Sequence, residues 1–252
     1  PYHWFYMEWI KKAKEKQVLY IHFTMDDNPS LSQSVKDRYK SLYSGAFYER
    51  FIEGKWVTAQ GLVYPMFSPE RHIKKCKGKF NRFYLSCDYG TVNPFSLGLW
   101  GECDGKWFRL DEYYYSGRDN GIQLTDEEYY RELEKLAENR EITALIIDPS
   151  AASFIQTVLR HGKFRVVKAN NDVLTGINRV CQALKDEEIF IYPACTDAIR
   201  EFSIYRWDDN IKKDAVKKEN DHAMDDIRYF VATVLGRENQ NSSFASVAIE
   251  RN

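Results

Sequence analysis

The stretch ITALIIDPS, residues 142–150, decides the architecture of this chain. Its first six residues are nearly all apolar, and they run directly into an aspartate and a proline. A continuous apolar run of this length is typical of a strand covered on both faces, whereas a half-exposed strand would alternate. Helix-forming segments flank the stretch at 125–140 and 151–162. We therefore predict that it is an inner strand of an α/β sheet.

Three strands are predicted before this stretch and two after it. FNRFYLSCDYG (80–90) reads as one strand, and PFSLGLWGECDGKWFRLDEYYY (94–115) reads as two strands around an Asp-Gly turn, the dipeptide that favours a tight hairpin. After it, strands and helices alternate, with strands at 164–169 and 188–193 and helices at 171–187, 195–205 and about 222–234. The predicted fold is a mixed sheet, with three antiparallel strands followed by parallel strands, flanked by helices on both faces.

Composition excludes several classes of protein. The chain has 252 residues, of which 29% are charged and 44% hydrophobic, as in an ordinary globular protein. Its net charge of -1 excludes a uniformly basic nucleic-acid coat, so any phosphate-binding surface must be local. No apolar run approaches the roughly 20 residues that cross a bilayer, and no signal-peptide pattern opens the chain. We expect no association with a membrane.

The five cysteines are scattered along the chain, odd in number and without a CxxC pair. This pattern predicts neither a zinc knuckle nor a disulfide framework, and it fits a reducing compartment.

Residues 1–70 are predicted to be a small, mostly helical unit. An amphipathic helix is expected over 3–16, a buried strand over 18–24, and two short helices on either side of Gly45. A basic connector, 71–79, joins this unit to the sheet domain, and the polar tail 237–252 follows it. No Walker phosphate loop occurs in the chain, so it is not by itself an ATP-driven motor.

Acids stand at three places where a rigid element begins or ends. Asp88 follows one apolar strand, Asp148 follows another, and Asp225 lies in the first turns of the final helix beside Asp226. Acids at the carboxyl ends of strands tend to meet in the ligand-binding crevice of an α/β sheet. Carboxylates that converge there repel one another unless a divalent cation lies between them, and oxygen ligands suit Mg²⁺ or Mn²⁺.

Each acid also has an ordinary structural interpretation. Asp88 and Asp148 fit turns or a helix cap, and an aspartate near a helix N-terminus favours the helix dipole. On a helical wheel, Asp226 lies beside the apolar stripe of the last helix and Asp225 nearly opposite it, while His222 shares a face with Asp225. The helical wheel therefore does not show which of the two aspartates would bind a metal.

Three motifs together resemble a known family: LSCDYG (85–90) with Pro94, LIIDPS (145–150), and VKKENDHAMDDIRYF (216–230). They are similar to the C-terminal nuclease domain of phage terminase large subunits, which have the RNase H-like, resolvase-type fold. The resemblance covers about residues 71–236. It implies that residues 1–70 are the end of an ATPase domain plus a linker, and that Asp225 is the third metal-binding aspartate. Asp226 departs from the pattern, because the family often has a small residue there, and its role stays open as a bystander or a further metal ligand.

The resemblance implies a metal-dependent DNA endonuclease that cuts concatemeric viral DNA during genome packaging. Asp88, Asp148 and Asp225 would hold two divalent cations, Mg²⁺ or Mn²⁺, for phosphodiester hydrolysis. His222 would orient a carboxylate or help in proton transfer, unless it is only a helix-start residue.

Contact with double-stranded DNA is expected to be sequence-tolerant and mostly to phosphates. The polar segment 205–219 is predicted to be a hairpin that guides DNA, through lysines that are otherwise ordinary solvated charges: Lys212, Lys213, Lys217 and Lys218. The resemblance also implies partners, namely the terminase small subunit, the portal protein and the ATPase domain of the full-length chain, in the host cytoplasm.

Two rival functions stay open. One is a resolvase- or transposase-type nuclease on the same fold, against which the last motif argues. The other is a non-catalytic module that binds DNA or docks on the portal, in which the acids could be replaced without loss.

Overall fold

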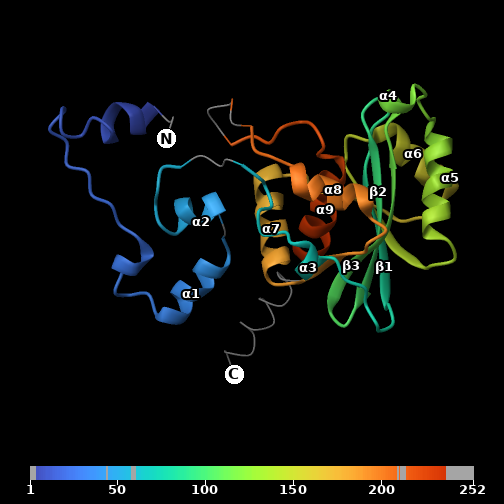
Figure 1. Cartoon of the computed structure of the whole chain (residues 1–252), viewed down its shortest axis with the longest axis horizontal. Helices are drawn as coiled ribbons and strands as arrows, with labels where there is room; N and C mark the ends of the chain where they lie inside the picture. Colours follow the sequence, from blue (N-terminus) through green and yellow to red (C-terminus); the bar gives the residue numbers. More distant parts are fainter. Residues whose placement is uncertain (1–3, 44, 58–60, 209, 211–213, 237–252) are drawn as a thin grey trace. The chain divides into compact units, whose positions relative to one another are not determined.

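The structure, a computed structural model, describes residues 4–43, 45–57, 61–208, 210 and 214–236. The chain forms two compact units, which are described separately (Figure 1). The first consists of Pro1–Pro65 and Tyr205–Lys218, and the second of Met66–Ile204 and Glu219–Asn252. The assignment of 1–70 to an ATPase domain and linker stays a prediction, and the predicted tail 237–252 lies outside the described residues.

The first unit contains short helices, as predicted. They are the π-helical turn η1 (Tyr6–Ile10), the 3-10 turn η2 (Met25–Asp27), α1 (Gln33–Ser41) and α2 (Gly45–Phe51). The two short helices predicted around Gly45 are confirmed, whereas the helix predicted over 3–16 is helical only to Ile10 and continues as turns.

The buried strand predicted over 18–24 is wrong. In this part of the described chain, residues 18–24 pair with no strand, and the side chains of Leu19, Ile21 and Phe23 are exposed. An apolar run becomes a strand only when a neighbouring strand takes its backbone hydrogen bonds, and the sequence pattern carries no information about that neighbour.

The segment 205–218 pairs with itself within the first unit. Trp207 forms an antiparallel bridge with Val216, and the backbone N–H of Asp208 donates to the carbonyl of Ala215. Trp207 also donates its N–H to the carbonyl of Gly61. The hairpin-like return predicted here is present, and it packs with a segment that lies far earlier in the sequence.

The second unit is built on one mixed sheet of six strands. The strands are β1 (Arg82–Asp88), β2 (Phe95–Cys103), β3 (Lys106–Tyr115), β4 (Ile142–Ile147), β5 (Val166–Lys168) and β6 (Ile189–Ile191), in the order β5-β4-β1-β2-β3-β6. β1, β2 and β3 pair antiparallel, while β4 joins β1, β5 joins β4 and β6 joins β3 in parallel. The predicted fold class is confirmed, and the quoted stretch is an inner strand between β1 and β5.

Helices cover both faces of this sheet (Figure 1). α5 (Asp126–Ala137) and α6 (Ala152–His161) lie on one face, and α9 (His222–Phe230), which continues as the π-helical turn η3 (Val231–Leu235), lies on the other with α7 (Val173–Lys185) and α8 (Thr196–Ile204). The short helices α3 (Pro69–His72) and α4 (Gly117–Asn120) complete the unit. Among the described residues, no helix has both the length and the apolar character needed to span a bilayer.

Aromatic stacking fixes a helix on each face. Phe95 of β2 stacks on Tyr129 of α5 with ring centroids 4.1 Å apart, and on the opposite face Trp100 stacks on Phe230 of α9, also at 4.1 Å. All four side chains are almost fully buried. Removing one such aromatic ring from a core typically costs about 3–5 kcal/mol, so these contacts anchor α5 and α9 firmly to the sheet.

The β2–β3 connection is the tight turn that the Asp-Gly pair predicted. Asp104 and Gly105 both have positive φ, 54° and 73°, as the mirror-image turns of hairpins require.

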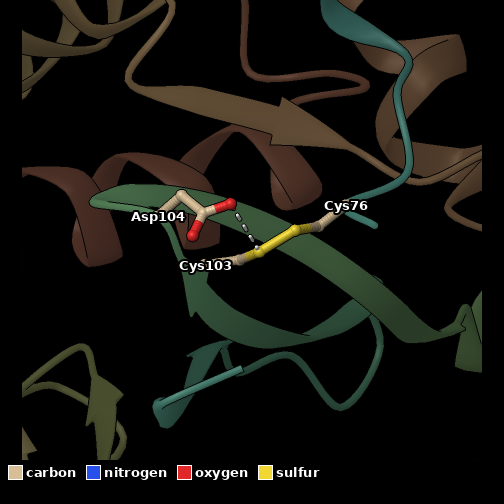
Figure 2. A group of neighbouring side chains, drawn as sticks. All are labelled: Cys76, Cys103 and Asp104. Carbon is tan, nitrogen blue, oxygen red and sulfur yellow. Dashed lines mark hydrogen bonds between the residues drawn. A yellow bond between two sulfur atoms is a disulfide. The ribbon is translucent and has the colours of Figure 1, made fainter. Parts of the chain in front are cut away.

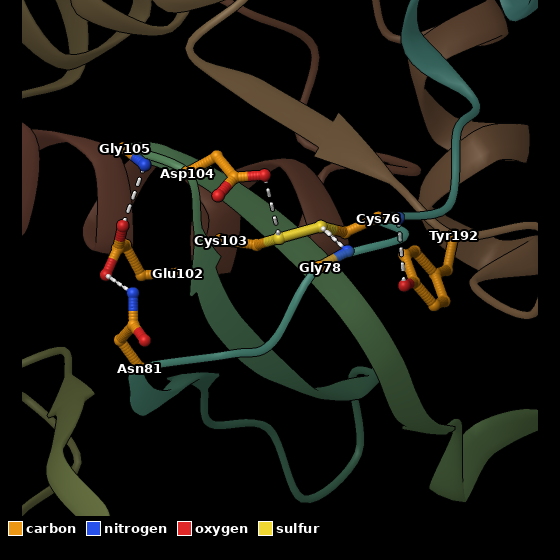
Figure 3. The surroundings of a disulfide bond; sticks show 8 residues. All are labelled: Cys76, Gly78, Asn81, Glu102, Cys103, Asp104, Gly105 and Tyr192. Carbon is orange, nitrogen blue, oxygen red and sulfur yellow. Dashed lines mark hydrogen bonds between the residues drawn. A yellow bond between two sulfur atoms is a disulfide. The ribbon is translucent and has the colours of Figure 1, made fainter.

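One disulfide, Cys76–Cys103, corrects the expectation drawn from the cysteine pattern (Figures 2 and 3). The segment 74–81 runs beside the end of β2, where the N–H of Asn81 donates to the carbonyl of Glu102. Next to the sulfurs, Cys76 donates its N–H to the hydroxyl of Tyr192 at 3.1 Å (Figure 3). Two cysteines 27 residues apart meet only because the sheet brings these segments together, which spacing alone does not reveal.

Candidate active site

Alternate side chains of β1 face α9 in a matched register. Tyr84 contacts Phe230 edge-on, Ser86 donates to Asp226 at 2.8 Å, and Oδ2 of Asp88 lies 2.8 Å from Nδ1 of His222. Two residues of a strand span about 6.6 Å and four residues of a helix about 6 Å, so steps of two along β1 match steps of four along α9. The sheet therefore selects His222, Asp226 and Phe230 as the row that faces β1.

Asp88 ends β1 in a buried environment, with 15% of its side chain exposed. Burial raises the pKa of this carboxyl to about 6, and the charge of Asp225 adds to the rise, while the hydrogen bond with His222 opposes it. A carboxylate that is costly to ionise because of burial and a like charge gains most from a positive partner.

His222 opens α9 and is largely buried between two acids. Nδ1 lies on Asp88, and Nε2 lies 3.7 Å from an oxygen of Asp221. Burial alone would lower the pKa of His222, but the hydrogen bond and charge of Asp88 outweigh it, and the pKa is raised above its ordinary value. The imidazole therefore holds the Asp88 carboxylate in place at the end of the strand.

Asp148 follows β4 beside Asp88, because the residues before them, Ile147 and Cys87, are paired in the parallel ladder. Its oxygens accept from the N–H of Ser150 at 2.7 Å and from the side chain of Asn171 at 3.5 Å. Burial raises the pKa of Asp148, but hydrogen bonds from Ser150, Tyr229 and Asn171 outweigh it, so the pKa lies below its ordinary value.

Asp225 lies one turn into α9 and is 7% exposed. Its Oδ1 accepts from Nη2 of Arg228 at 2.8 Å and from Nε at 3.2 Å. The same guanidinium donates to the backbone carbonyl of Asn171 at 3.1 Å, and the side chain of Asn171 donates to Asp148. Arg228 thus contacts Asp225 directly and Asp148 through Asn171.

Tyr229 of α9 is a buried phenol that the charges of all three acids affect. It is 4% exposed, and its pKa is raised first by burial and then by the charges of Asp88, Asp225 and Asp148, against the opposing charge of Arg228. The sequence prediction missed this residue, although its place within the last motif was visible. The phenol lies within electrostatic reach of all three carboxylates.

The carboxylates do not close into a tight cluster. In the part of the chain that the structure describes, the three of them are not all within 4.8 Å of one another, whereas Cys76, Cys103 and Asp104 are (Figure 2). Asp225 and Asp148 are each turned to hydrogen-bond donors. The cysteine group is no better candidate for a metal, because its two sulfurs are joined in the disulfide.

Asp226, expected as a possible metal ligand, has other partners. It is fully buried, and its oxygens accept from Ser86, Ser96 and the guanidinium of Arg109, which is itself fully buried. Nη2 of Arg109 is 2.9 Å from Oδ2. Since both oxygens already accept hydrogen bonds from side chains of the sheet, we do not propose Asp226 as a metal ligand.

Two buried glutamates, which the sequence prediction also missed, cap the helices around this site. Glu201 of α8 accepts from the backbone N–H groups of Ala223 and Met224 at 2.8 and 3.3 Å, at the start of α9. Glu112 of β3 accepts from the N–H of Asp197 at 2.7 Å, at the start of α8. A carboxylate is favoured at a helix N-terminus, where unpaired N–H groups point outward. The caps set where α9 begins, and hence where Asp225 lies.

The predicted role of four lysines in DNA binding stays a prediction. Lys212 and Lys213 fall outside the described residues. Lys217 and Lys218 belong to the first unit, where the N–H of Lys217 donates to the carbonyl of Arg206.

Solved structures with the same fold include large terminases of bacteriophages. The large terminase of one thermophilic bacteriophage, solved alone and with ADP, is 46% identical, with a TM-score of 0.84 for the form without nucleotide, over 93% of this chain and 59% of that protein. The chain is homologous to phage large terminases. Among curated proteins, the large terminase subunit of Escherichia phage T5 is 20% identical over 229 residues, which are 85% of this chain and 51% of the T5 protein. The chain thus spans about half the length of that curated relative. No protein-family model matches the sequence.

Two isolated nuclease domains of large terminases share only the fold with this chain. That of P22 is 16% identical with a TM-score of 0.54, and it matches 68% of this chain and 90% of its own length. That of the thermophilic phage G20c, solved with bound magnesium, is 9% identical with a TM-score of 0.52, over 68% of this chain and 97% of its own.

Proposed function

We propose that this chain is a metal-dependent DNA endonuclease that cuts concatemeric viral DNA during genome packaging. The observation that carries the proposal is that Asp88 and Asp148 follow two neighbouring paired strands, while Asp225 lies in the first turn of α9 and its charge acts on Asp88. The homology to large terminases supports a role in packaging, and the shared fold of terminase nuclease domains supports hydrolysis at this site.

Asp88, Asp148 and Asp225 would hold two divalent cations. Their carboxylate oxygens are hard ligands that suit Mg²⁺ or Mn²⁺, and the raised pKa of Asp88 fits a site that a cation would relieve. The nuclease of phage G20c has been solved with bound magnesium and with bound cobalt. When bound, a pair of such ions supplies an activated water and stabilises the leaving oxygen of a phosphodiester.

The chain's own residues position these ligands. His222 holds Oδ2 of Asp88 at 2.8 Å, and Arg228 holds Asp225 while it also bonds to the loop beside Asp148. The hydrogen bond and charge of Asp88 raise the pKa of His222, which favours the charged imidazolium as the partner of that carboxylate. Because β1 and α9 are anchored by buried aromatic contacts, Asp88 and Asp225 are held on rigid elements, whereas Asp148 lies in the turn that follows β4.

We assign DNA contact to backbone phosphates. Lys212, Lys213, Lys217 and Lys218 remain the candidates in the segment that precedes α9. Their joint substitution by alanine is expected to weaken binding to all sequences alike and to flatten the salt dependence. The small terminase subunit, the portal protein and an ATPase domain of the longer polypeptide are the partners this function calls for, in the host cytoplasm.

The test is plasmid cleavage by the purified chain with EDTA, Mg²⁺ or Mn²⁺. We expect metal-dependent nicking and linearisation that disappears in Asp88→Asn and Asp148→Asn. The matched control is Asp186→Asn, an exposed aspartate at the end of α7. Cleavage that survives in both site variants would contradict the proposed site. Absence of cleavage with every metal, from a folded chain that still binds DNA, would favour the non-catalytic docking module instead.

A further inference from the structure

A pocket of about 420 Å³ lies at the edge of the sheet, apart from the three acids. The end of β5, the first half of α7 and the turn η3 form its walls, all within the second unit. Its polar lining side chains are Lys168, Asn170, Thr175, Arg179 and Thr233. Pockets that hold organic ligands occupy about 300–1,000 Å³, so this one has room for a phosphate group with an attached sugar.

The lining is rich in hydrogen-bond donors and, among the described residues, contains no acid. Arg179 is paired on one side, through Nη2, with Glu188 at 3.1 Å. Its Nε–H is buried and has no hydrogen-bond acceptor within the described chain. A buried donor without a partner costs about 1–3 kcal/mol, and a ligand oxygen would remove that cost.

One more donor is uncommitted. Within the described residues, the ammonium of Lys168 has no hydrogen bond or ion pair, whereas the side chain of Thr175 bonds to Asp172. Thr233 accepts the backbone N–H of Asn170 at 3.0 Å, which fixes the loop that forms the pocket rim. A lysine ammonium and a planar guanidinium that line one cavity are groups that bind phosphate oxygens.

The pocket is joined to the candidate active site through a short stretch of backbone. Ala169, which lines the pocket, donates its N–H to the carbonyl of Ile147, the residue before Asp148. Asn171, two residues further on, reaches Asp148 with its side chain at 3.5 Å. A DNA strand whose scissile phosphate lay at the acids would therefore have a second phosphate-binding position along the same sheet edge.

We propose that Lys168 and Arg179 form a phosphate subsite that binds the DNA backbone beside the cleavage site. The identification of the phosphate as part of DNA rests on the proposed nuclease function. The inference that the pocket binds a phosphate group does not depend on that function.

Two measurements test the subsite, neither of which requires cleavage. In the first, the full chain is titrated with inorganic phosphate, and the amide resonances of Asn170 and Thr175 are followed by NMR. We expect these resonances to shift in the wild type and to shift much less in Lys168→Ala. Lys168 is exposed, so its truncation leaves the fold intact, which the unchanged remaining resonances would verify.

In the second measurement, binding of a short labelled duplex is followed by fluorescence anisotropy in EDTA over a range of salt concentrations. Loss of one phosphate contact lowers the slope of log K against log salt by about 0.9, so Lys168→Ala is expected to show that decrease for every sequence. Lys135→Ala is the control, because Lys135 is an exposed lysine on α5 that pairs with Glu132. Its slope is expected to match the wild type.

The outcomes separate the two proposals. No phosphate-induced shift at Asn170 and Thr175 would overturn the subsite. A shift that depends on Lys168, together with an unchanged DNA slope, would overturn the DNA source and assign the pocket to a free phosphate compound. If the wild type cuts plasmid but Lys168→Ala has the same salt slope as the wild type, only the proposed DNA subsite is contradicted. If Lys168→Ala lowers the salt slope but the wild type never cuts plasmid, only the proposed nuclease function is contradicted.

Discussion

Asp225 and Asp226 are neighbours in the sequence, yet their carboxylates pair with different arginines. Asp225 bonds to Arg228 within α9 and acts electrostatically on Asp88. Asp226 is fully buried against the sheet, in an ion pair with Arg109. A rotation of 100° between consecutive helical residues sends one carboxylate to the strand ends and the other to the middle of the sheet.

The two aspartates should therefore differ in what their loss destroys. We expect Asp226→Asn to lower the free energy of unfolding by about 2–3 kcal/mol, because it leaves Glu112 as the one carboxylate, among the described residues, that pairs with the buried Arg109 charge. Asp225→Asn should cost about 1 kcal/mol, since Arg228 keeps its bonds to backbone carbonyls, but it should abolish cleavage. Urea unfolding and plasmid cleavage of both variants check this. A stable, inactive Asp226→Asn would contradict the assignment.

Gly176 of α7 should resist a substitution that usually stabilises helices. Alanine in place of glycine in a helix interior is normally worth about 1 kcal/mol. Here a Cβ would come within 2.6 Å of Cγ of Arg228, the side chain that holds Asp225. We expect Gly176→Ala to destabilise the chain by about 1–3 kcal/mol and to reduce cleavage. The matched comparison is Ser203→Ala, on the exposed side of α8, which should change neither property.

Glu201 should make stability depend on pH. It is fully buried, and burial is the largest cause that raises its pKa from 4.5 to about 7. Below pH 4.5 both the folded and the unfolded chain hold the proton. As the pH rises towards 7, only the unfolded chain releases it, so the folded state loses stability, by about 3 kcal/mol for a shift of this size.

Glu201→Gln should remove this loss while it keeps an oxygen for the cap of α9. The free energies of unfolding of wild type and variant, measured in urea between pH 4.5 and 8, should diverge in favour of the variant up to about pH 7 and then stay apart. Glu141→Gln, at an exposed glutamate, serves as the control. A constant difference across this pH range would show that Glu201 ionises normally in the folded chain.

His222 should matter for metal binding more than for folding. It touches Asp88 rather than any reacting atom, and groups that orient metal ligands typically contribute about 10- to 100-fold to affinity. Calorimetric titration with Mn²⁺ should show that loss in His222→Ala, and Asn at this position should recover part of it through a hydrogen bond. His161→Ala, where an exposed histidine pairs with Glu127, should bind metal as the wild type does. Equal affinities in all three variants would leave His222 without a role in the site.

Local sequence patterns were enough to predict the order of the strands and helices in the sheet domain. The apolar run at 142–147 and the Asp-Gly turn at 104–105 each depend on neighbours a few residues away, and the structure confirms both. The strand predicted over 18–24 failed because a strand also needs a distant partner for its backbone. The pairing of Cys76 with Cys103 was missed for the same reason.

The sequence by itself determined a mixed α/β sheet with acids at two strand ends and at one helix start. Only the tertiary structure decided which side chains each acid contacts. Steps of two along β1 meet steps of four along α9, and this register places Asp226 opposite Ser86 and His222 opposite Asp88. It also revealed the supporting side chains Arg109, Glu201 and Tyr229, whose roles depend on burial beside residues far away in the sequence. Contacts of that kind follow from the packing of a helix on a sheet, which no local pattern encodes.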